Sequence, residues 1–383
     1  MSTATIVQQR TAAKTSASAD ASVHDPSAHL PFNLATLKAA IPAHCFEKHL
    51  WTSIYYLARD FAIIAALYAL YPAVCRYGDA LGLLKFAWWN VVGFFGWCLF
   101  VVGHDCGHRT FADSVMLCDI FGHIAHTPLL VPFHGWRVSH RKHHENHNHV
   151  DNDHSWRPVC KKSYLEYCAD TLAARLAKIV RFSHALLVLY PMYLVLDSEF
   201  TSGNHFNPKG RLFAPEERLG AAISTACVVA WSVFLLYTFP LWTLLDAYFM
   251  PIVFFWVWID LVTYLHHTDG SLTYYRGQAW SFLKGALSTM DRSYGRWIDH
   301  LHHDIGTHMV HHMFFTKIPH YHLLDATEAL KPMLGEHYKV DETPILTAYL
   351  KSKEACHFVA DKGDVVNYRA GADLQSEEQK KAA

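Results

Sequence analysis

The sequence predicts an all-α integral membrane protein, with four transmembrane helices and a histidine-rich helical cap on the cytosolic side. Three observations predict it: long uncharged runs, basic residues confined almost entirely to one side, and histidines clustered at helical spacing. Of 383 residues, 51% are hydrophobic and only 17% are charged, whereas an average soluble domain is about 25% charged. The net charge of −1 excludes the basic excess that is typical of nucleic-acid binding.

Four apolar stretches predict the membrane spans: roughly residues 56–76, 85–103, 219–239 and 243–264. About 20 helical residues cross the hydrocarbon layer. The run Leu219–Leu245 has 27 uncharged residues and is followed, after Asp246, by 13 more apolar residues. This is too long for one helix, so we expect two helices with a break at Pro240. The first span is long enough only if the Arg59 side chain extends to the headgroups.

Two shorter apolar stretches, Ile120–Phe133 and Phe182–Leu196, contain histidines and prolines. Their length favours interfacial or re-entrant segments over full spans. Three segments then share one side of the membrane: residues 1–55, 104–218 and 265–383. Among the lysines and arginines, only Arg76 and Lys85 fall on the opposite side, where they flank the loop between the first two spans. Because basic loops stay in the cytoplasm, the three segments are predicted to be cytosolic.

The chain divides into a disordered N-terminal tail (1–30), a membrane domain (31–345) and a polar C-terminal tail (346–383). The first residues lack the apolar region of a secretory signal peptide, whereas their Ser, Thr and Ala content leaves a short plastid-type leader open. The nine cysteines include no C-x-x-C pair. They indicate reduced thiols rather than a disulfide framework or a cysteine-based zinc site.

The 29 histidines are concentrated in two windows, residues 104–154 and 266–322. Within these windows they form three clusters: His104 and His108; His140, His143 and His144; and His308, His311 and His312. Residues spaced three and four apart share one face of a helix, so each cluster presents its imidazoles in one direction. Eight imidazoles exceed the four ligands of a usual zinc site, which predicts two metal ions. Imidazole suits Fe, Zn, Cu and Ni, so the ligand type leaves the metal open.

The sequence around these clusters resembles the three histidine boxes of integral-membrane acyl-lipid (fatty acid) desaturases. The matching segments are Gly103–Phe111, His134–Trp156 and His302–Thr327. The strings HGWR and HHDIGTH are similar to the omega-3 (delta-15) branch, and Asp105 stands where the omega-6 (delta-12) branch usually has Glu. The similarity runs from near Pro31 to about Tyr338.

The sequence departs from plant relatives of this family at a few positions near the boxes: Lys142, His154 and Phe315–Lys317. None of these is a box histidine, so the departures bear on substrate preference rather than on metal binding.

The resemblance implies a four-helix stem and a cytosolic cap that binds two non-heme Fe ions, with O₂ as co-substrate and no catalytic residues beyond the metal ligands. Nine ligands are implied: His104, His108, His140, His143, His144, His267, His308, His311 and His312. His267 is the additional ligand, at the end of the fourth span. Other histidines are expected to orient ligands or to have no role in the centre: His147, His149, His154, His266, His302 and His303.

The implied reaction converts linoleoyl to alpha-linolenoyl chains on a membrane glycerolipid, such as phosphatidylcholine. No heme domain with an HPGG motif is present in the sequence, so electrons are expected from a separate carrier, cytochrome b5, or ferredoxin in a plastid. Lys380 and Lys381 resemble a dilysine retrieval signal. They favour the endoplasmic reticulum membrane, with the termini and metal site cytosolic; a plastid membrane is the alternative.

Two other functions remain open at this point. An omega-6 desaturase would act on oleoyl chains, and a bis-histidine heme cytochrome would also use histidines in a membrane protein. A metal transporter fits less well, because transporters bind their substrates near the membrane midplane and these clusters lie beyond the predicted span ends.

Overall fold

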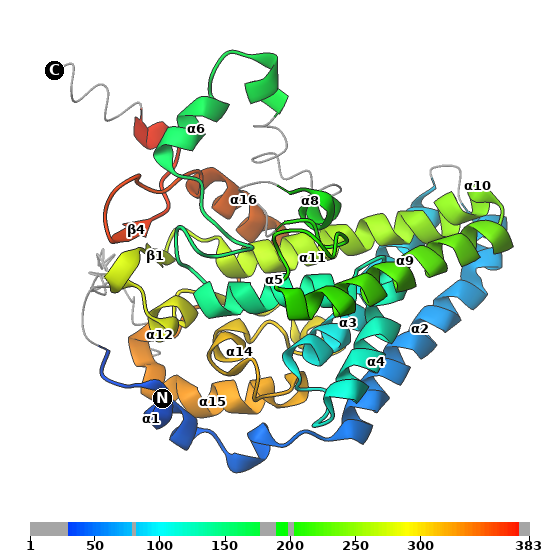
Figure 1. The fold of residues 1–383 in the computed structure, drawn as a ribbon, viewed down its shortest axis with the longest axis horizontal. Helices are drawn as coiled ribbons and strands as arrows, with labels where there is room; N and C mark the ends of the chain where they lie inside the picture. Colours follow the sequence, from blue (N-terminus) through cyan, green and yellow to red (C-terminus); the bar gives the residue numbers. More distant parts are fainter. Residues whose placement is uncertain (1–29, 79–81, 177–188, 198–202, 375–383) are drawn as a thin grey trace, which may run out of the picture.

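The computed structural model describes residues 30–78, 82–176, 189–197 and 203–374. Within these residues, four helices are long and apolar enough to cross a membrane. They are α2 (Leu50–Tyr77), α3 (Leu83–His108), the segment Pro215–Thr238 that contains α9 (Arg218–Thr238), and the segment Leu241–His267. Figure 1 shows them as an elongated stem that extends from a broader cap. The predicted fold class is confirmed, and each predicted span falls on one of these four helices.

The predicted break at Pro240 is also present. Helix α9 ends at Thr238, and the fourth span begins with α10 (Leu241–Thr243), continues through one π-helical turn (η4, Leu244–Phe249) and ends with α11 (Met250–His267). Asp246, the charge that interrupts the apolar run, lies in this turn. Its Oδ2 accepts a hydrogen bond from the Tyr71 hydroxyl at 2.6 Å and pairs with Lys85 Nζ at 2.7 Å. This pairing compensates the cost of a charge within a span.

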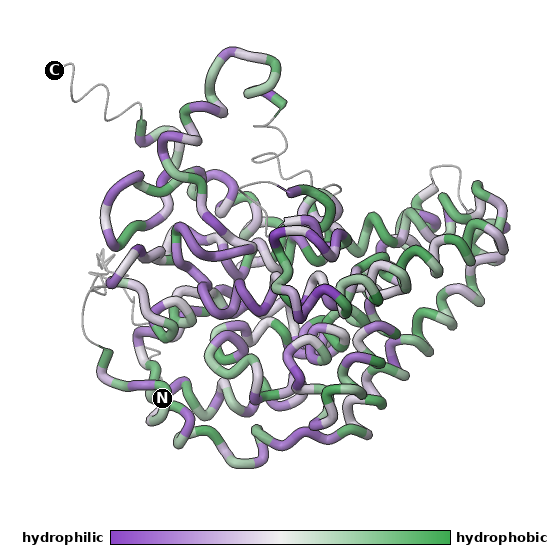
Figure 2. The backbone as a smooth tube through the Cα atoms, in the orientation of Figure 1, coloured by the Kyte–Doolittle hydropathy of each residue, from purple (hydrophilic) through white to green (hydrophobic). Residues whose placement is uncertain are grey.

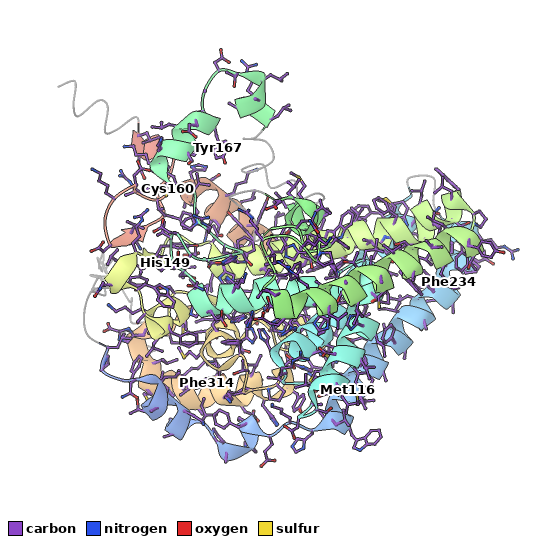
Figure 3. The ribbon with its side chains drawn as sticks, in the orientation of Figure 1. Met116, His149, Cys160, Tyr167, Phe234 and Phe314 are labelled. Carbon is purple, nitrogen blue, oxygen red and sulfur yellow. The ribbon has the colours of Figure 1, made fainter. Side chains whose placement is uncertain are left out.

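Helix α3 is the central helix of the stem. Its apolar window is 67% buried, against 17–39% for the other three, because α2, α4 (Val115–His126) and α11 all pack on it. A Cβ atom at Gly93 would lie 2.4 Å from Phe254 Cβ, so glycine is what allows α11 to approach this closely. The stem helices are mostly apolar, as the green colour along them in Figure 2 shows, and many of their apolar side chains are exposed. Phe234, for example, projects from α9 in Figure 3 and is 51% exposed.

The Arg59 side chain does not extend to the headgroups, although this was expected from the sequence. Its side chain is 13% exposed and turns inward, where Nε donates to Asp60 Oδ1 at 3.0 Å and Nη2 donates to the Leu301 carbonyl at 2.7 Å. The neighbouring carboxylate and carbonyl therefore take the place of the lipid headgroup. Helix α2 begins at Leu50, six residues before the predicted start, so the span needs no extension by Arg59.

The second histidine cluster reaches the centre through a sharp bend. Helix α4 and η2 (Thr127–Leu129) are followed by α5 (Phe133–Asn146) at an angle of 103°. The stretch Ile120–Phe133, predicted not to cross the membrane, includes this bend. The other such stretch, Phe182–Leu196, lies partly outside the described residues, and its described part contains α8 (Leu189–Val195).

The remaining elements are short. Except for η3, which begins the third span at Pro215, they form the cap. The helices are α1 (Leu34–Ala40), η1 (Ala43–Phe46), α6 (Lys161–Tyr167), η3 (Pro215–Glu217), η5 (Gly277–Ala279), α12 (Phe282–Ala286), α13 (Arg296–Leu301), α14 (His308–Phe314), η6 (His320–His322), α15 (Leu323–Leu334) and η7 (Gly335–His337). The strands are β1 (Thr273–Tyr275), β2 (Asp291–Arg292), β3 (Val340–Asp341) and β4 (Val365–Asn367). β1 pairs antiparallel with β4, and β2 pairs parallel with β3.

The segment after residue 345 differs from the expected polar tail. Helix α16 (Ile345–Ala355) packs on α11, and β4 pairs with β1. Phe358 and Val359 are completely buried, Phe358 against Val159 and Tyr164 and Val359 against Tyr274 and Val366. The segment therefore folds because it carries apolar residues that the cap buries. The N-terminal tail and the two C-terminal lysines lie outside the described residues.

Candidate metal centre

Four helices bring the predicted ligands to one place at the cap end of the stem. The last two turns of α3 carry His104 and His108, and α11 ends with His267. Helices α5 and α14 carry the two clusters in which histidines are spaced three and four apart. All nine predicted residues come together, and eight of them are buried, with His140 partly exposed.

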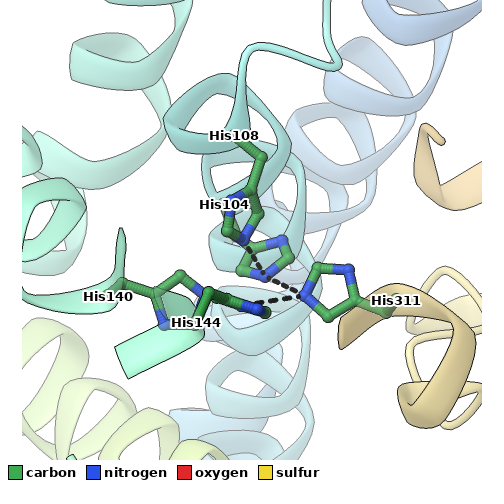
Figure 4. Close-up of side chains that lie close together, drawn as sticks. All are labelled: His104, His108, His140, His144 and His311. Carbon is green, nitrogen blue, oxygen red and sulfur yellow. Dashed lines mark hydrogen bonds between the residues drawn. The ribbon is translucent and has the colours of Figure 1, made fainter. Parts of the chain in front are cut away.

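Five of the histidines form the first group: His104, His108, His140, His144 and His311. Each offers one ring nitrogen, and these atoms all lie within 4.8 Å of one another. The Nε2 atoms follow one another at short distances, 3.1 Å from His108 to His104 and 3.2 Å from His104 to His311. Figure 4 shows the rings of this group converging from α3, α5 and α14.

The second group contains His143, His267 and His312, again with ring nitrogens within 4.8 Å of one another. His308 joins it, because its Nε2 lies 3.0 Å from His267 Nε2 and 3.1 Å from His312 Nε2. The two groups are adjacent, since the rings of His144 and His312 have centroids 4.2 Å apart. Nine imidazoles are thus divided into a group of five and a group of four.

The rings are suited to bind cations. Burial and the surrounding imidazoles hold the pKa values of His308, His311 and His312 well below the usual histidine range, so these rings are neutral at pH 7. A neutral imidazole has one nitrogen that can ligate a metal. Two nitrogens at about 2.1 Å from one ion and at a right angle are about 3.0 Å apart, which fits the observed Nε2 separations. In addition, Nε2 of His143 is buried and has no hydrogen-bond partner among the described residues.

A carboxylate that the sequence analysis did not single out orients the second group. Asp153, in the loop after α5, accepts a hydrogen bond from Nδ1 of His143 at 2.7 Å, which directs Nε2 toward the other histidines of the group. Burial alone would raise the pKa of Asp153, but His143 and the N–H groups of Ser155 and Trp156 lower it, so the group is ionised. Trp156 stacks on His267 with centroids 5.7 Å apart. The only signal for Asp153 in the sequence was its position nine residues beyond His144.

The first group has a weaker carboxylate contact. Asp105 Oδ1 lies 3.6 Å from His104 Nδ1, beyond hydrogen-bond distance. Its Oδ2 accepts instead from the backbone N–H of His320 at 2.9 Å and interacts with the His320 ring at 2.8 Å. Aromatic rings cover the group, with Phe315 stacked on His144 at 4.5 Å and Trp136 on His140 at 4.4 Å.

The other cap histidines fall outside the two groups. His266 stacks on His308 at 4.2 Å, and its Nδ1 lies 2.6 Å from the Met290 carbonyl, so it positions a predicted ligand. His147 packs near His312 and has both ring nitrogens at backbone carbonyls. His302 and His303 interact with Trp97 and Asp60 respectively, toward α3 and α2.

A cavity of about 480 Å³, the histidine cavity, lies beside both groups. His104 and His140 of the first group line it, as do His143, His267 and His308 of the second. The rest of its wall is predominantly apolar and includes Trp97, Phe100, Tyr190 and Ile259. The cavity can therefore hold an alkyl chain against the histidines and exclude water from them.

Comparison with known proteins agrees with this geometry. A family model described as fatty acid desaturase matches residues 82–343, and a model described as a domain of unknown function matches residues 2–69. The sn-1 acyl-lipid omega-3 desaturase (ferredoxin) of Nostoc sp. is 46% identical over 342 residues, which cover 88% of this chain and 91% of that protein. The temperature-sensitive sn-2 acyl-lipid omega-3 desaturase (ferredoxin), chloroplastic, of Arabidopsis thaliana is 43% identical over 365 residues, covering 92% and 81%.

A third relative, the omega-3 fatty acid desaturase, chloroplastic, of Brassica napus, is 43% identical over 368 residues, which cover 92% of this chain and 87% of that protein. These relatives support the predicted omega-3 branch over the omega-6 branch. They also support a desaturase, which is an oxidoreductase, over a bis-histidine heme cytochrome. The chain belongs to the fatty acid desaturase family and, within it, to the acyl-lipid omega-3 desaturases.

Proposed function

We propose that this enzyme inserts a cis double bond at the omega-3 position of linoleoyl chains in membrane glycerolipids and so produces alpha-linolenoyl chains. The observation that carries the proposal is that nine imidazoles converge beside a predominantly apolar cavity, which can hold an alkyl chain. The names of the relatives, which are acyl-lipid omega-3 desaturases, support the position of the bond and the lipid-linked substrate.

The two histidine groups would each hold one Fe ion, with five ligands in one and four in the other. Bound iron supplies, with O₂, the oxidising power to remove hydrogens from an unactivated methylene, which no side-chain acid or base can do. The residues of the chain perform the other tasks. Asp153 and Trp156 orient ligands, while Trp97, Phe100 and Tyr190 exclude water and hold the alkyl chain in place.

The nature of the nine donor groups favours iron binding for this reaction. Imidazoles that are neutral and buried bind Fe well, and a dry cavity keeps the reacting carbons away from solvent. The chain enters, in this proposal, from the side where Leu176 and Leu196 are exposed at the cavity edge. The glycerolipid remains in the bilayer while its acyl chain passes between α8 and α11 toward the histidines.

For the electron donor we propose ferredoxin, with the enzyme in a plastid membrane and its metal centre on the stromal side. The two (ferredoxin) relatives and the chloroplastic ones support this alternative over cytochrome b5 in the endoplasmic reticulum. The basic residues that accompany all three histidine clusters support this side of the membrane.

Expression in yeast supplied with linoleate tests both proposals. Cells that also contain plant ferredoxin and its reductase should accumulate alpha-linolenate, and cells with only their own cytochrome b5 should accumulate little. A diene made from oleate, with no omega-3 triene in either strain, would contradict the omega-3 activity. Equal triene in both strains would contradict the ferredoxin requirement alone.

A further inference from the structure

A second apolar cavity lies deeper in the stem, below the histidine cavity. This stem cavity has a volume of about 450 Å³ and is lined by α2, α3, η2, α9 and the fourth span. On α3 it is lined by residues 92–99, whereas the histidine cavity is lined on the same helix by residues 97–104. On the fourth span the corresponding residues are 243–255 and 259–267. The two cavities are therefore stacked along the axis of the stem.

Three aromatic rings separate these cavities. Phe100 and Tyr190 line the histidine cavity, and Phe255 lines the stem cavity. Each ring contacts the other two, with centroids 5.7 Å apart for Phe100 and Phe255, 5.7 Å for Tyr190 and Phe255, and 6.2 Å for Phe100 and Tyr190. All three side chains are buried, and Phe255 is completely so. We call these three rings the aromatic floor.

The aromatic floor is held firmly. A Cβ atom at Gly96 would lie 3.4 Å from Phe255 Cβ, so α3 is packed against this side chain. The backbone N–H of Tyr190 donates to Asp260 Oδ2 at 3.1 Å, which attaches the start of α8 to α11. Phe100 is stacked on His126 with centroids 4.5 Å apart. The rings thus have little freedom to move apart.

The floor is also close to the first histidine group. Phe100 and His104 lie four residues apart on α3, so they share a face and are separated by about 6 Å along the helix axis. This distance leaves room for only a short alkyl segment between the floor and the histidines.

An omega-3 double bond begins at the third carbon from the methyl end, so only two carbons lie beyond it. The enzyme must therefore stop the methyl end close to the reacting carbons, and an apolar barrier one helical turn away meets that requirement. On the basis of the omega-3 activity proposed above, we propose that the aromatic floor is the stop for the methyl end. Phe100, Tyr190 and Phe255 are then specificity-determining residues, and the stem cavity is a space that they close to the substrate.

The test uses the variant Phe255→Ala, which removes the ring shared by both cavities. Yeast with ferredoxin and its reductase receive either linoleate or oleate, whose last eight carbons are saturated, and mass spectrometry locates the new double bonds. In Phe255→Ala the methyl end should descend into the stem cavity. We expect omega-3 product from linoleate to fall about tenfold, since misplacement by about 1 Å already impairs such reactions strongly. With oleate, double bonds should appear four or more carbons from the methyl end.

The matched control is Leu244→Ala, about three turns away on the far wall of the stem cavity. It widens the stem cavity without opening the floor and should leave the omega-3 product unchanged. If Phe255→Ala does not accumulate in the membrane, Phe255→Leu takes its place.

Two results would overturn the proposal: omega-3 product at the wild-type level from an accumulated variant, or loss of that product with no displaced double bond on oleate. The second would mean that Phe255 only packs. The strain with the unaltered enzyme tests the proposed function separately. Absence of omega-3 product in that strain would contradict the proposed function rather than the role of the aromatic floor.

Discussion

The two histidine groups are supported in different ways. In the group of five, the rings come from regular positions on α3, α5 and α14 and are covered by the stacked rings of Phe315 and Trp136. In the group of four, a loop carboxylate holds His143 at 2.7 Å, and Trp156 from the same loop stacks on His267. The first group therefore depends on helix packing, whereas the second also depends on a hydrogen bond from outside the helices.

This difference indicates where each half of the centre is sensitive. Substitutions that leave the helices intact should affect the group of four more than the group of five. Each of the first three predictions below pairs a change in one group with a matched change in the other, so that the two results compare the groups directly. The last prediction concerns an exposed cluster outside both groups.

The largest effects are expected for ligand removal. His311→Ala takes one of five imidazoles from the first group, and His143→Ala takes one of four from the second. Both should abolish desaturation while the protein stays in the membrane, because the proposed reaction uses an ion in each group. Iron per protein, measured by plasma emission, should fall further in His143→Ala. Either variant with full iron and substantial activity would show that the ligand assignment is wrong.

The next largest effect should come from Asp153→Asn. The amide keeps the size of the carboxylate but loses its charge at the His143 hydrogen bond, a change that typically costs 10–100-fold in metal affinity or activity. Asp105→Asn is the matched variant, and its effect should be several-fold smaller because Asp105 lies 3.6 Å from His104. Activity on linoleate and iron content after dialysis check both. Equal losses would remove the distinction between the two groups.

A smaller effect is expected when the stacked rings are removed. Trp156→Leu and Phe315→Leu each delete one ring that packs on a ligand, and such contacts contribute about 0.5–1.5 kcal/mol. Iron affinity should fall by up to about tenfold in each. Titration with a competing chelator measures this fall, with the corresponding wild-type curve as the reference. A loss of all activity in Phe315→Leu would show that the first group needs more than helix packing.

The smallest effect is expected at the surface. His44, His322 and Asp325 also place potential ligand atoms within 4.8 Å of one another, but this cluster is largely exposed. His322→Ala should change the activity and the two-iron content by less than about twofold, as is usual for surface substitutions. A loss of one iron in His322→Ala would place an ion outside the buried groups.

The sequence was sufficient to predict the four spans, because adjacent uncharged runs of this length are rare in the cores of soluble proteins. It also predicted the eight clustered histidines, because their spacing defines a helix face, whereas His267 followed only from the family resemblance. It could not predict Asp153 or Trp156, since their contacts depend on how the loop after α5 folds back. The division into five and four also depends on which ring nitrogens face each other in space. The inward turn of Arg59 and the burial of Phe358 are likewise tertiary contacts that leave no periodic pattern in the sequence.

The order of the ligands along the chain has a consequence for biogenesis. Three of the nine histidines lie on α14, which follows all four stem helices. At the usual rate of synthesis, the ribosome needs roughly ten to thirty seconds to proceed from the α5 histidines to α14. Neither group is complete during this interval, because each takes at least one histidine from α14. If the two groups hold iron as proposed, loading becomes a late assembly step that follows membrane insertion, and a chain that ends before α14 would be inserted without a complete centre.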